Sequence, residues 1–208
     1  YKRQLPEYIG ASPFEIQVLT PMRKGELGVE HLNEVLQYYL NPASESKKEK
    51  EGRTGVFREG DKVMQVKNNY KLEWKITNAK GFSIEEGLGV FNGDMGIIKQ
   101  INTYSERITV VFDENREAEY PFSSLDELEL AYAITIHKSQ GSEYPAVVLP
   151  LLSGPPILCN RNLLYTAITR AQKCVAIAGR QSMVEQMIHN ETEQKRYSGL
   201  NDCLKEGL

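Results

Sequence analysis

The sequence predicts an α/β fold in which a mainly parallel sheet is interrupted by a small all-β insertion. At both ends of the chain, strand-like and helix-like segments alternate with short links, which is the pattern of a parallel sheet covered by helices. Between residues 56 and 122 the apolar pattern changes to a period of two, with no long helical stretch. The insertion therefore lies within one α/β domain, whose first strand and helix precede it.

The opening segment, residues 1–42, predicts that first strand and helix. Residues 15–21, EIQVLTP, are typical of a short buried strand, and Met22, Arg23 and Lys24 follow at its exit. A helix is predicted next, because apolar residues recur on one face: Leu32, Val35, Leu36, Tyr39 and Leu40. Asn41 and Pro42 end this helix, since proline cannot continue it.

The middle of the chain predicts a linker and then the insertion. Residues 43–55 are almost wholly polar and charged, which predicts a mobile linker. Residues 56–125 predict a small antiparallel β-barrel, with strand-like runs within 62–66, 90–101 and 108–115 and with turns at 92–94 and 102–107. Basic and aromatic side chains interleave along it: Lys62, Lys67, Lys71, Lys75, Lys80, Tyr70 and Trp74. That composition is typical of single-strand binding, but surface lysines on a hairpin, with the tryptophan in the barrel core, give the same pattern.

The last block, residues 126–190, returns to mixed α/β character. Four residues at its start share one helical face, Ala131, Ile134, Thr135 and Lys138, with Gly141 as a helix terminator. A strand over 131–136 is the alternative. Beyond it we predict a strand at 146–152, a helix at 161–172, a strand at 174–179 and a helix at 181–189. Residues 191–208 form a polar tail that we expect to be ordered only in part.

Composition narrows the class of protein. The chain has 208 residues, 40% of them hydrophobic, which is enough for a real core. No apolar run approaches the roughly 20 residues of a membrane span and no signal peptide opens the sequence, so we expect a cytoplasmic protein without a membrane partner. The cysteines, Cys159, Cys174 and Cys203, are isolated and lack the spacing of a metal site, so no metal centre is predicted.

Charge is unevenly distributed along the chain. The net charge is −3, yet residues 131–180 hold five basic side chains against one acidic side chain. Residues 111–130 show the reverse, with seven acids against Arg116. Local sign governs attraction to phosphate more than the total does, so the basic block is a candidate anion-binding region.

The chemistry concentrates in two segments of that block. Residues 133–144, AITIHKSQGSEY, bring a hydroxyl, an imidazole, an amine, an amide, a glycine and a carboxylate together. Residues 163–172, LLYTAITRAQ, hold a single arginine, Arg170, in an apolar helix-like stretch. A guanidinium there is costly to desolvate unless an anion accompanies it, and phosphate matches its planar fork. An ion pair with an acid such as Glu143 is the alternative.

Together these segments resemble motifs V and VI of superfamily 1 DNA helicases, in the RecD-like branch related to the exodeoxyribonuclease V alpha subunit. Residues 16–42, IQVLTPMRKGELGVEHLNEVLQYYLNP, resemble the strand, loop and helix at motif IV. The resemblance implies a RecA-like second motor domain, built from residues 1–42 and 126–190. It also implies that the insertion at 56–125 is an SH3-like barrel.

The resemblance also assigns roles to residues. It makes Arg170 the catalytic arginine finger that reaches the γ-phosphate of ATP. The nucleotide ligands would be Gln140, Gly141, Glu143, Lys138 and Arg23. The contacts to single-stranded DNA would be Thr135, His137 and Lys24. For Gln140, Gly141 and Glu143 the alternative is a capped helix end with glycine as its terminator. For Thr135 and His137 it is a core threonine and a hydrogen-bonded histidine, and for Arg23 and Lys24 it is a solvated turn. Asn162 and Tyr165 are expected to pack and position rather than bind.

The implied function is the carboxyl-terminal motor half of an ATP-dependent DNA helicase, with 5′ to 3′ polarity. Its partners would be single-stranded DNA and an amino-terminal motor domain of the same protein, with other DNA-repair subunits an open class. ATP and Mg²⁺ would be held mostly by that other half, because the chain lacks the phosphate-binding loop GxxxxGK[ST], and the chain alone should be inactive. A non-catalytic nucleic-acid-binding adaptor and the helicase half of a conjugative relaxase are the alternatives.

Overall fold

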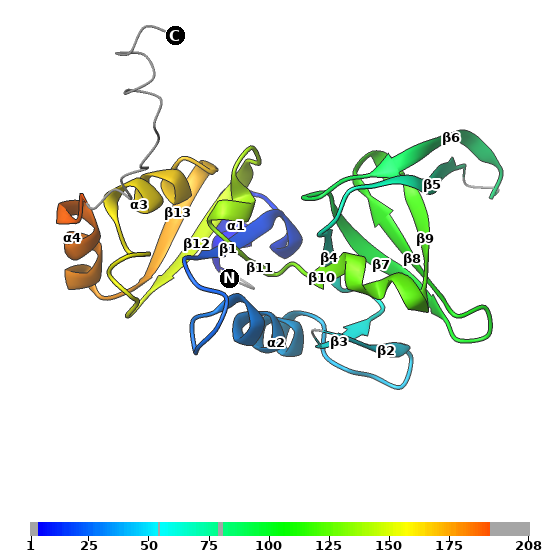
Figure 1. The fold of residues 1–208 in the computed structure, drawn as a ribbon, viewed down its shortest axis with the longest axis horizontal. Helices are drawn as coiled ribbons and strands as arrows, with labels where there is room; N and C mark the ends of the chain where they lie inside the picture. Colours follow the sequence, from blue (N-terminus) through cyan, green and yellow to red (C-terminus); the bar gives the residue numbers. More distant parts are fainter. Residues whose placement is uncertain (1–3, 54, 79–80, 192–208) are drawn as a thin grey trace, which may run out of the picture.

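The computed structural model describes residues 4–53, 55–78 and 81–191. Figure 1 shows two lobes side by side, an α/β lobe and a β-rich lobe, with helix α2 lying beneath their junction. The predicted tail lies outside the described residues from residue 192 onward, as does Lys80.

The α/β lobe is built on a parallel sheet in the order β11-β1-β12-β13. Its strands are β1 (Ile16–Thr20), β11 (Ala133–Thr135), β12 (Tyr144–Leu151) and β13 (Ala171–Gly179). Strand β1 is buried along its whole length and pairs in parallel with both β11 and β12. The central strand thus comes from one side of the insertion and its neighbours from the other, which confirms the predicted RecA-like fold.

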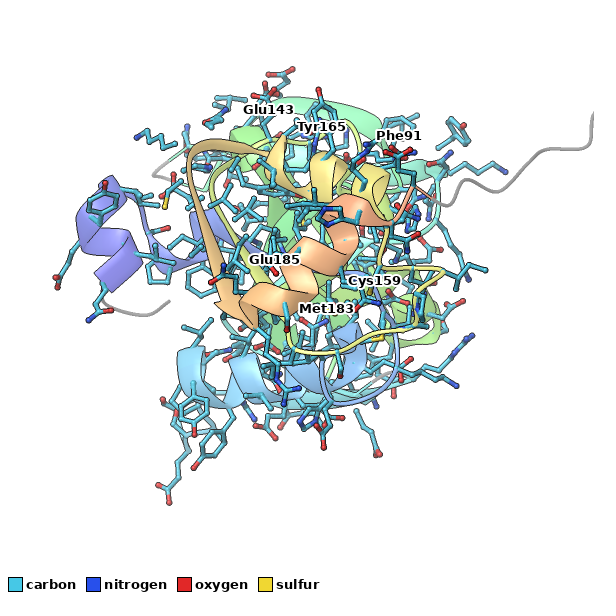
Figure 2. All side chains as sticks on the ribbon, turned by 90° about the vertical axis from the view of Figure 1, so that its left-hand side faces the viewer. Phe91, Glu143, Cys159, Tyr165, Met183 and Glu185 are labelled. Atoms are coloured by element: carbon cyan, nitrogen blue, oxygen red, sulfur yellow. The ribbon has the colours of Figure 1, made fainter. Side chains whose placement is uncertain are left out.

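Helices cover this sheet on both faces. Figure 2 looks onto α3 (Arg161–Ile168) and α4 (Gln181–His189), which cover one face. Their buried side chains join the core of the lobe: Leu163, Leu164, Ala167, Met183 and Met187. The remaining helical elements are α1 (Gln4–Ile9), the short 3-10 helix η1 (Pro13–Glu15) and α2 (Val29–Leu40).

The second lobe is a curled antiparallel sheet in the order β10-β4-β7-β8-β9-β5-β6. Its strands are β4 (Lys62–Gln65), β5 (Asn69–Thr77), β6 (Ser83–Val90), β7 (Met95–Asn102), β8 (Arg107–Phe112), β9 (Glu117–Pro121) and β10 (Leu128–Leu130). The 3-10 turns η2 (Asp113–Asn115) and η3 (Phe122–Glu127) flank β9. Gly93, at φ +104°, makes the predicted turn between β6 and β7. The barrel prediction is confirmed, although β10 extends it past residue 125.

The predicted linker at residues 43–55 is wrong for its second half. Strand β2 (Glu49–Gly52) pairs antiparallel with β3 (Gly55–Arg58) in a hairpin. The hairpin folds because Phe57 is buried in the barrel core and because Glu49 and Arg58 form an ion pair at 2.6 Å across the two strands. Its polar composition reflects a two-stranded ribbon with one face exposed.

The helix predicted over residues 131–138 is wrong, and the strand alternative is right. Ala131, Tyr132, Ala133 and Ile134 are all buried, whereas a surface helix would expose one face. Their backbone instead runs beside β1, and β11 pairs Thr135 with Thr20. Gly141, at φ +89°, does follow a helix end, but the helix is the short 3-10 turn η4 (His137–Ser139), whose C-cap is Gln140.

The predicted helix at 161–172 is too long. Helix α3 ends at Ile168, with Thr169 as its C-cap, and β13 begins at Ala171. The Thr169 hydroxyl donates back to Thr166 O at 3.0 Å, a local bond that competes with helix propagation. Arg170 therefore lies in the turn between α3 and β13.

Lys62 is buried at the junction of the two lobes, where its Nζ donates to Phe14 O at 2.7 Å and to Gln17 Oε1 at 2.8 Å. Burial lowers the pKa of Lys62 to about 8, against the opposing attraction of Asp113 and Glu15. Between that folded value and the ordinary value of 10.5, the unfolded chain binds more protons, so stability rises with pH.

We therefore expect the free energy of unfolding to increase by between roughly 1 and 2 kcal/mol from pH 8 to about pH 9.5, as measured by urea unfolding. Lys62→Met should abolish this increase, and Lys99→Met, at a half-exposed lysine of strand β7, should retain it. The same increase in Lys62→Met would assign it to another group.

Candidate functional site

Arg170 is held at the amino-terminal end of β13 by neutral oxygen atoms. Its Nε donates to Thr166 O at 3.3 Å, Nη1 to Ser142 O at 3.2 Å and Nη2 to Thr169 Oγ1 at 3.2 Å. Among the described residues, no carboxylate lies within ion-pair distance of this half-buried guanidinium. The ion pair with Glu143 is therefore not formed, and the positive charge stays available to an anion.

The loop before β12 lies against Arg170. Tyr144 N donates to Arg170 O at 2.9 Å, and Glu143 Oε2 accepts from Gln172 Nε2 at 3.2 Å. Gln140, Gly141 and Glu143 are exposed there, and no atom lies within 4 Å of the position that a Cβ on Gly141 would take. Figure 2 shows Glu143 at the same end of the lobe as Tyr165 of α3. The structure thus brings Gln140, Gly141 and Glu143 together with Arg170.

A second group of predicted residues gathers beside β11. Thr135 ends that strand, and its Oγ1 accepts from Lys138 N at 3.3 Å. Lys138 Nζ pairs with Glu129 Oε2 at 2.9 Å, and Arg23 Nη2 pairs with Glu129 Oε1 at 3.0 Å. Arg23 and Lys24 follow the carboxyl end of β1, and His137 and Lys24 are exposed.

Glu129 is not among the site residues that the sequence predicts. Burial tends to raise the pKa of Glu129, but the hydrogen bonds and positive charges of Lys138 and Arg23 outweigh it, so the pKa is lowered. The sequence carried one signal: Glu129 stands between Leu128 and Leu130, both buried, in a strand whose side chains alternate between faces. Which cations it would meet depended on the pairing of β10 with β4.

The predicted site residues therefore form two groups at opposite ends of the parallel sheet. Arg170 and Glu143 precede β13 and β12, at their amino ends, whereas Thr135 and Arg23 lie at or beyond the carboxyl ends of β11 and β1. Lys138 and Arg23, predicted as nucleotide ligands, belong to the second group. The sequence could not separate them because the chain crosses the whole sheet within eight residues, from 136 to 143.

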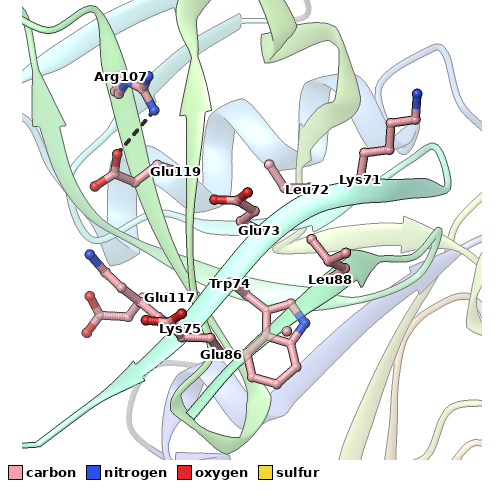
Figure 3. A pocket seen from close by; sticks show the side chains of 11 residues that line it. Lys71, Leu72, Glu73, Trp74, Lys75, Glu86, Leu88, Arg107, Glu117 and Glu119 are labelled. Carbon is pink, nitrogen blue, oxygen red and sulfur yellow. Dashed lines mark hydrogen bonds and ion pairs between the residues drawn. The ribbon is translucent and has the colours of Figure 1, made fainter. Parts of the chain in front are cut away.

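The lysines of the barrel that lie beside Trp74 are balanced by acidic side chains among the described residues. Figure 3 shows Trp74, Lys71 and Lys75 lining a cavity of about 630 Å³ on strands β5, β6, β8 and β9. Three basic side chains there face four acidic ones, among them Glu119, which pairs with Arg107 at 3.3 Å. Trp74 packs on the barrel core against Gly87, where a Cβ would lie 2.3 Å from the ring. This arrangement favours the alternative in which surface lysines flank a hairpin and Trp74 belongs to the barrel core.

The described residues offer neither a metal cluster nor a membrane-spanning helix. Among the described residues, no three His, Cys, Asp or Glu side chains are grouped so that they could hold a metal ion. In the same part of the chain, no helix is both long and apolar enough to cross a membrane.

Tyr165 is exposed on α3, and Asn162 lies one turn before it.

Two family models match the chain, and both describe helicases. The model for the SH3 domain of ATP-dependent RecD-like DNA helicases matches residues 32–112. The model for the UvrD-like helicase C-terminal domain matches residues 130–178. An SH3-like barrel set into a parallel α/β lobe, with each part matched by a helicase model, thus defines a segment of a helicase.

Two relatives narrow the family. The chain is 39% identical over 167 residues to the ATP-dependent RecD2 DNA helicase of Deinococcus radiodurans, covering 80% of this chain and 20% of that protein. It is 30% identical over 191 residues to the RecBCD enzyme subunit RecD of Mycolicibacterium smegmatis, covering 92% of this chain and 29% of that protein. The chain belongs to the RecD-like helicase family, and it spans less than a third of the length of these relatives.

A solved structure shares the fold. The Pif1 helicase from Bacteroides, crystallised in complex with ADP-AlF3 and single-stranded DNA, matches with a TM-score of 0.51 and 18% sequence identity. The match covers 91% of this chain and 44% of that chain.

Proposed function

We propose that this chain acts as the second motor domain of an ATP-dependent, RecD-like DNA helicase with 5′ to 3′ polarity. In this function Arg170 is the catalytic arginine finger, and Gln140, Gly141 and Glu143 contact the nucleotide. The observation that carries the proposal is the half-buried guanidinium of Arg170, bonded only to neutral oxygens at 3.2 to 3.3 Å. Such a cation is preorganised for an anion that arrives from outside the chain.

The chemistry of phosphoryl transfer fits this arrangement. Negative charge develops on the equatorial oxygens of the transferred phosphoryl group, and an arginine supplied by a second domain stabilises it. Because the Arg170 side chain is bonded to backbone oxygens of α3 and of the loop before β12, hydrolysis would require this lobe to close on the lobe that holds ATP. The magnesium ligands and the phosphate-binding loop would belong to that other motor domain.

We assign the opposite group to the DNA backbone. Thr135, His137 and Lys24 are the proposed phosphate ligands, and Arg23 and Lys138 join them. The support is their position: they lie beside Thr135, at the other end of the sheet from Arg170. Hydroxyl, imidazole, ammonium and guanidinium groups can all donate to phosphate oxygens. Glu129 would hold the two cations in place until a phosphate takes them.

The test compares the full-length protein with this chain of 208 residues, by phosphate release with and without excess single-stranded DNA. We expect DNA-stimulated hydrolysis by the full-length protein and none by the chain alone, which lacks the phosphate-binding loop. A turnover near 1 per second by the chain alone, within the ordinary enzyme range, would contradict the half-motor assignment. A full-length protein that binds DNA without hydrolysing ATP would instead be an adaptor.

A further inference from the structure

Helix α2 buries a polar stripe in addition to part of the apolar face that its sequence predicts. Asn33 and Gln37, one turn apart, and Asn41, which follows the helix, are only 5%, 8% and 3% exposed. The apolar positions Val35 and Tyr39 are exposed instead. Burying an amide is costly unless its donors and acceptor are all bonded, so these side chains must have specific partners.

Those partners are the two chain segments that cross between the lobes. On the outward crossing, Gln37 Nε2 donates to Val56 O at 2.8 Å and Asn41 Nδ2 to Glu59 O at 3.1 Å. On the return crossing, Asn33 Nδ2 donates to Leu130 O at 2.9 Å and to Ala133 O at 3.0 Å. Its Oδ1 accepts from Ala133 N at 2.8 Å. Figure 1 shows α2 beneath both crossings, between β11 and the β2–β3 hairpin.

A buried carboxylate, Asp61, joins the two crossings. Its Oδ1 accepts from Asn41 Nδ2 at 2.6 Å and from Tyr132 OH at 2.9 Å. Its Oδ2 accepts from Gln37 Nε2 at 2.5 Å and from Arg58 N at 2.7 Å. Asp61 is fully buried and accepts from these four donors, and no cationic side chain of the described residues forms an ion pair with it. We call Asn33, Gln37, Asn41, Asp61 and Tyr132 the junction network.

The network has a mechanical consequence. Apolar side chains at an interface can slide past one another, whereas directional hydrogen bonds in a water-free site define one arrangement. The bonds of Asn33 to Ala133 fix the first residue of β11, and the bonds of Asp61 fix the start of β4 in the barrel. Strand β11 and the barrel are therefore tied to the same helix.

We propose that the junction network locks the SH3-like barrel to β11, so that both move as one body when the motor closes. Asp61, Tyr132 and Asn33 are then positioning residues that couple ATP hydrolysis to strand separation. This inference rests on the proposed helicase function, because β11 ends in Thr135 at the proposed DNA contacts. It assigns the network a role in coupling, without any contact to ATP or DNA.

The test uses Tyr132→Phe in the full-length protein, because it removes one bond to Asp61 and leaves the ring in place. Tyr120→Phe is the matched control: Tyr120 is also fully buried and also makes one side-chain bond, to Gln65 Oε1 at 2.9 Å, but it lies within the barrel. Asp61→Asn should disrupt the junction network more than Tyr132→Phe does, because the asparagine amide places N–H groups opposite the donors that now bond the carboxylate. Two spin labels, introduced as unnatural amino acids at the exposed Tyr104 and Ser182, report the distance between the lobes.

We expect Tyr132→Phe to broaden the distance distribution and to lower the base pairs unwound per ATP by about five-fold, the factor for one lost buried hydrogen bond. DNA-stimulated hydrolysis and single-strand affinity should stay within about two-fold. Tyr120→Phe should change neither the distances nor the ratio. An unchanged distribution, an unchanged ratio, or an equal loss in both variants would each overturn the inference. A wild-type protein without DNA-stimulated hydrolysis would refute the proposed function instead, and the distances would still test the lock.

Discussion

Replacing Arg170 by alanine in the full-length protein should reduce DNA-stimulated ATP turnover by about 10³-fold or more, the scale of a lost arginine finger. The guanidinium has no carboxylate to balance among the described residues, so its removal leaves no unpaired buried charge. The oxygens it bonds are two backbone carbonyls and one hydroxyl, which water can satisfy at a part-buried site. The fold and most of the DNA affinity should therefore persist.

Two further variants define the origin of that loss. Arg170→Lys should restore little of the activity, because a single ammonium cannot reproduce the bidentate fork. Arg161→Ala, at the first residue of helix α3, removes an arginine that is 53% exposed and paired with Glu191, and turnover should stay near wild type. If Arg170→Ala also hydrolyses ATP at near the wild-type rate, Arg170 serves only to fasten the Ser142 loop to α3.

The sequence predicted the architecture because its apolar periods change where the structure changes. The strand at β1, the barrel turns and the closing helix α4 all follow from local pattern and turn chemistry. The resemblance to helicase motifs named the candidate site residues that the structure gathers into two groups. It could not separate Lys138 and Arg23 from Arg170, because that requires the register of four parallel strands.

Three of the differences between the prediction and the structure share one physical cause, which is burial at the junction of the lobes. Ala131 and Ile134 share a helical face in sequence, yet residues 131–134 are all buried and run beside β1. Asn33 and Gln37 belong by type to a solvated face, and Lys62 to a surface hairpin. Each is buried because a partner more than 15 residues away satisfies its polar atoms. Long-range hydrogen bonds of this kind leave no periodic signal in the sequence.

The two ends of the sheet should give different mutant phenotypes in the full-length protein. Thr135→Ala with His137→Ala should weaken single-strand binding and flatten its salt dependence, because each lost phosphate contact lowers the slope by at most about 0.7. Gln140→Ala should leave DNA affinity unchanged without nucleotide, yet impair the change in affinity that ATP causes. Coupling of this kind needs a residue that bonds the nucleotide in only one state of the motor.

Glu129→Gln should strengthen single-strand DNA binding, whereas Thr135→Ala with His137→Ala should weaken it. It therefore serves as the control for the assignment of DNA and nucleotide to opposite ends of the sheet. Glu129 neutralises Arg23 at 3.0 Å and Lys138 at 2.9 Å, so its loss leaves two cations free to meet phosphate. Since part-exposed ion pairs contribute up to about 1 kcal/mol each, single-strand affinity at low salt should rise by about five-fold. Titrating labelled oligonucleotide at several salt concentrations, with and without a non-hydrolysable ATP analogue, measures all three effects. If Thr135→Ala with His137→Ala and Gln140→Ala behave alike, and Glu129→Gln leaves affinity unchanged, the two ends of the sheet do not divide DNA from nucleotide.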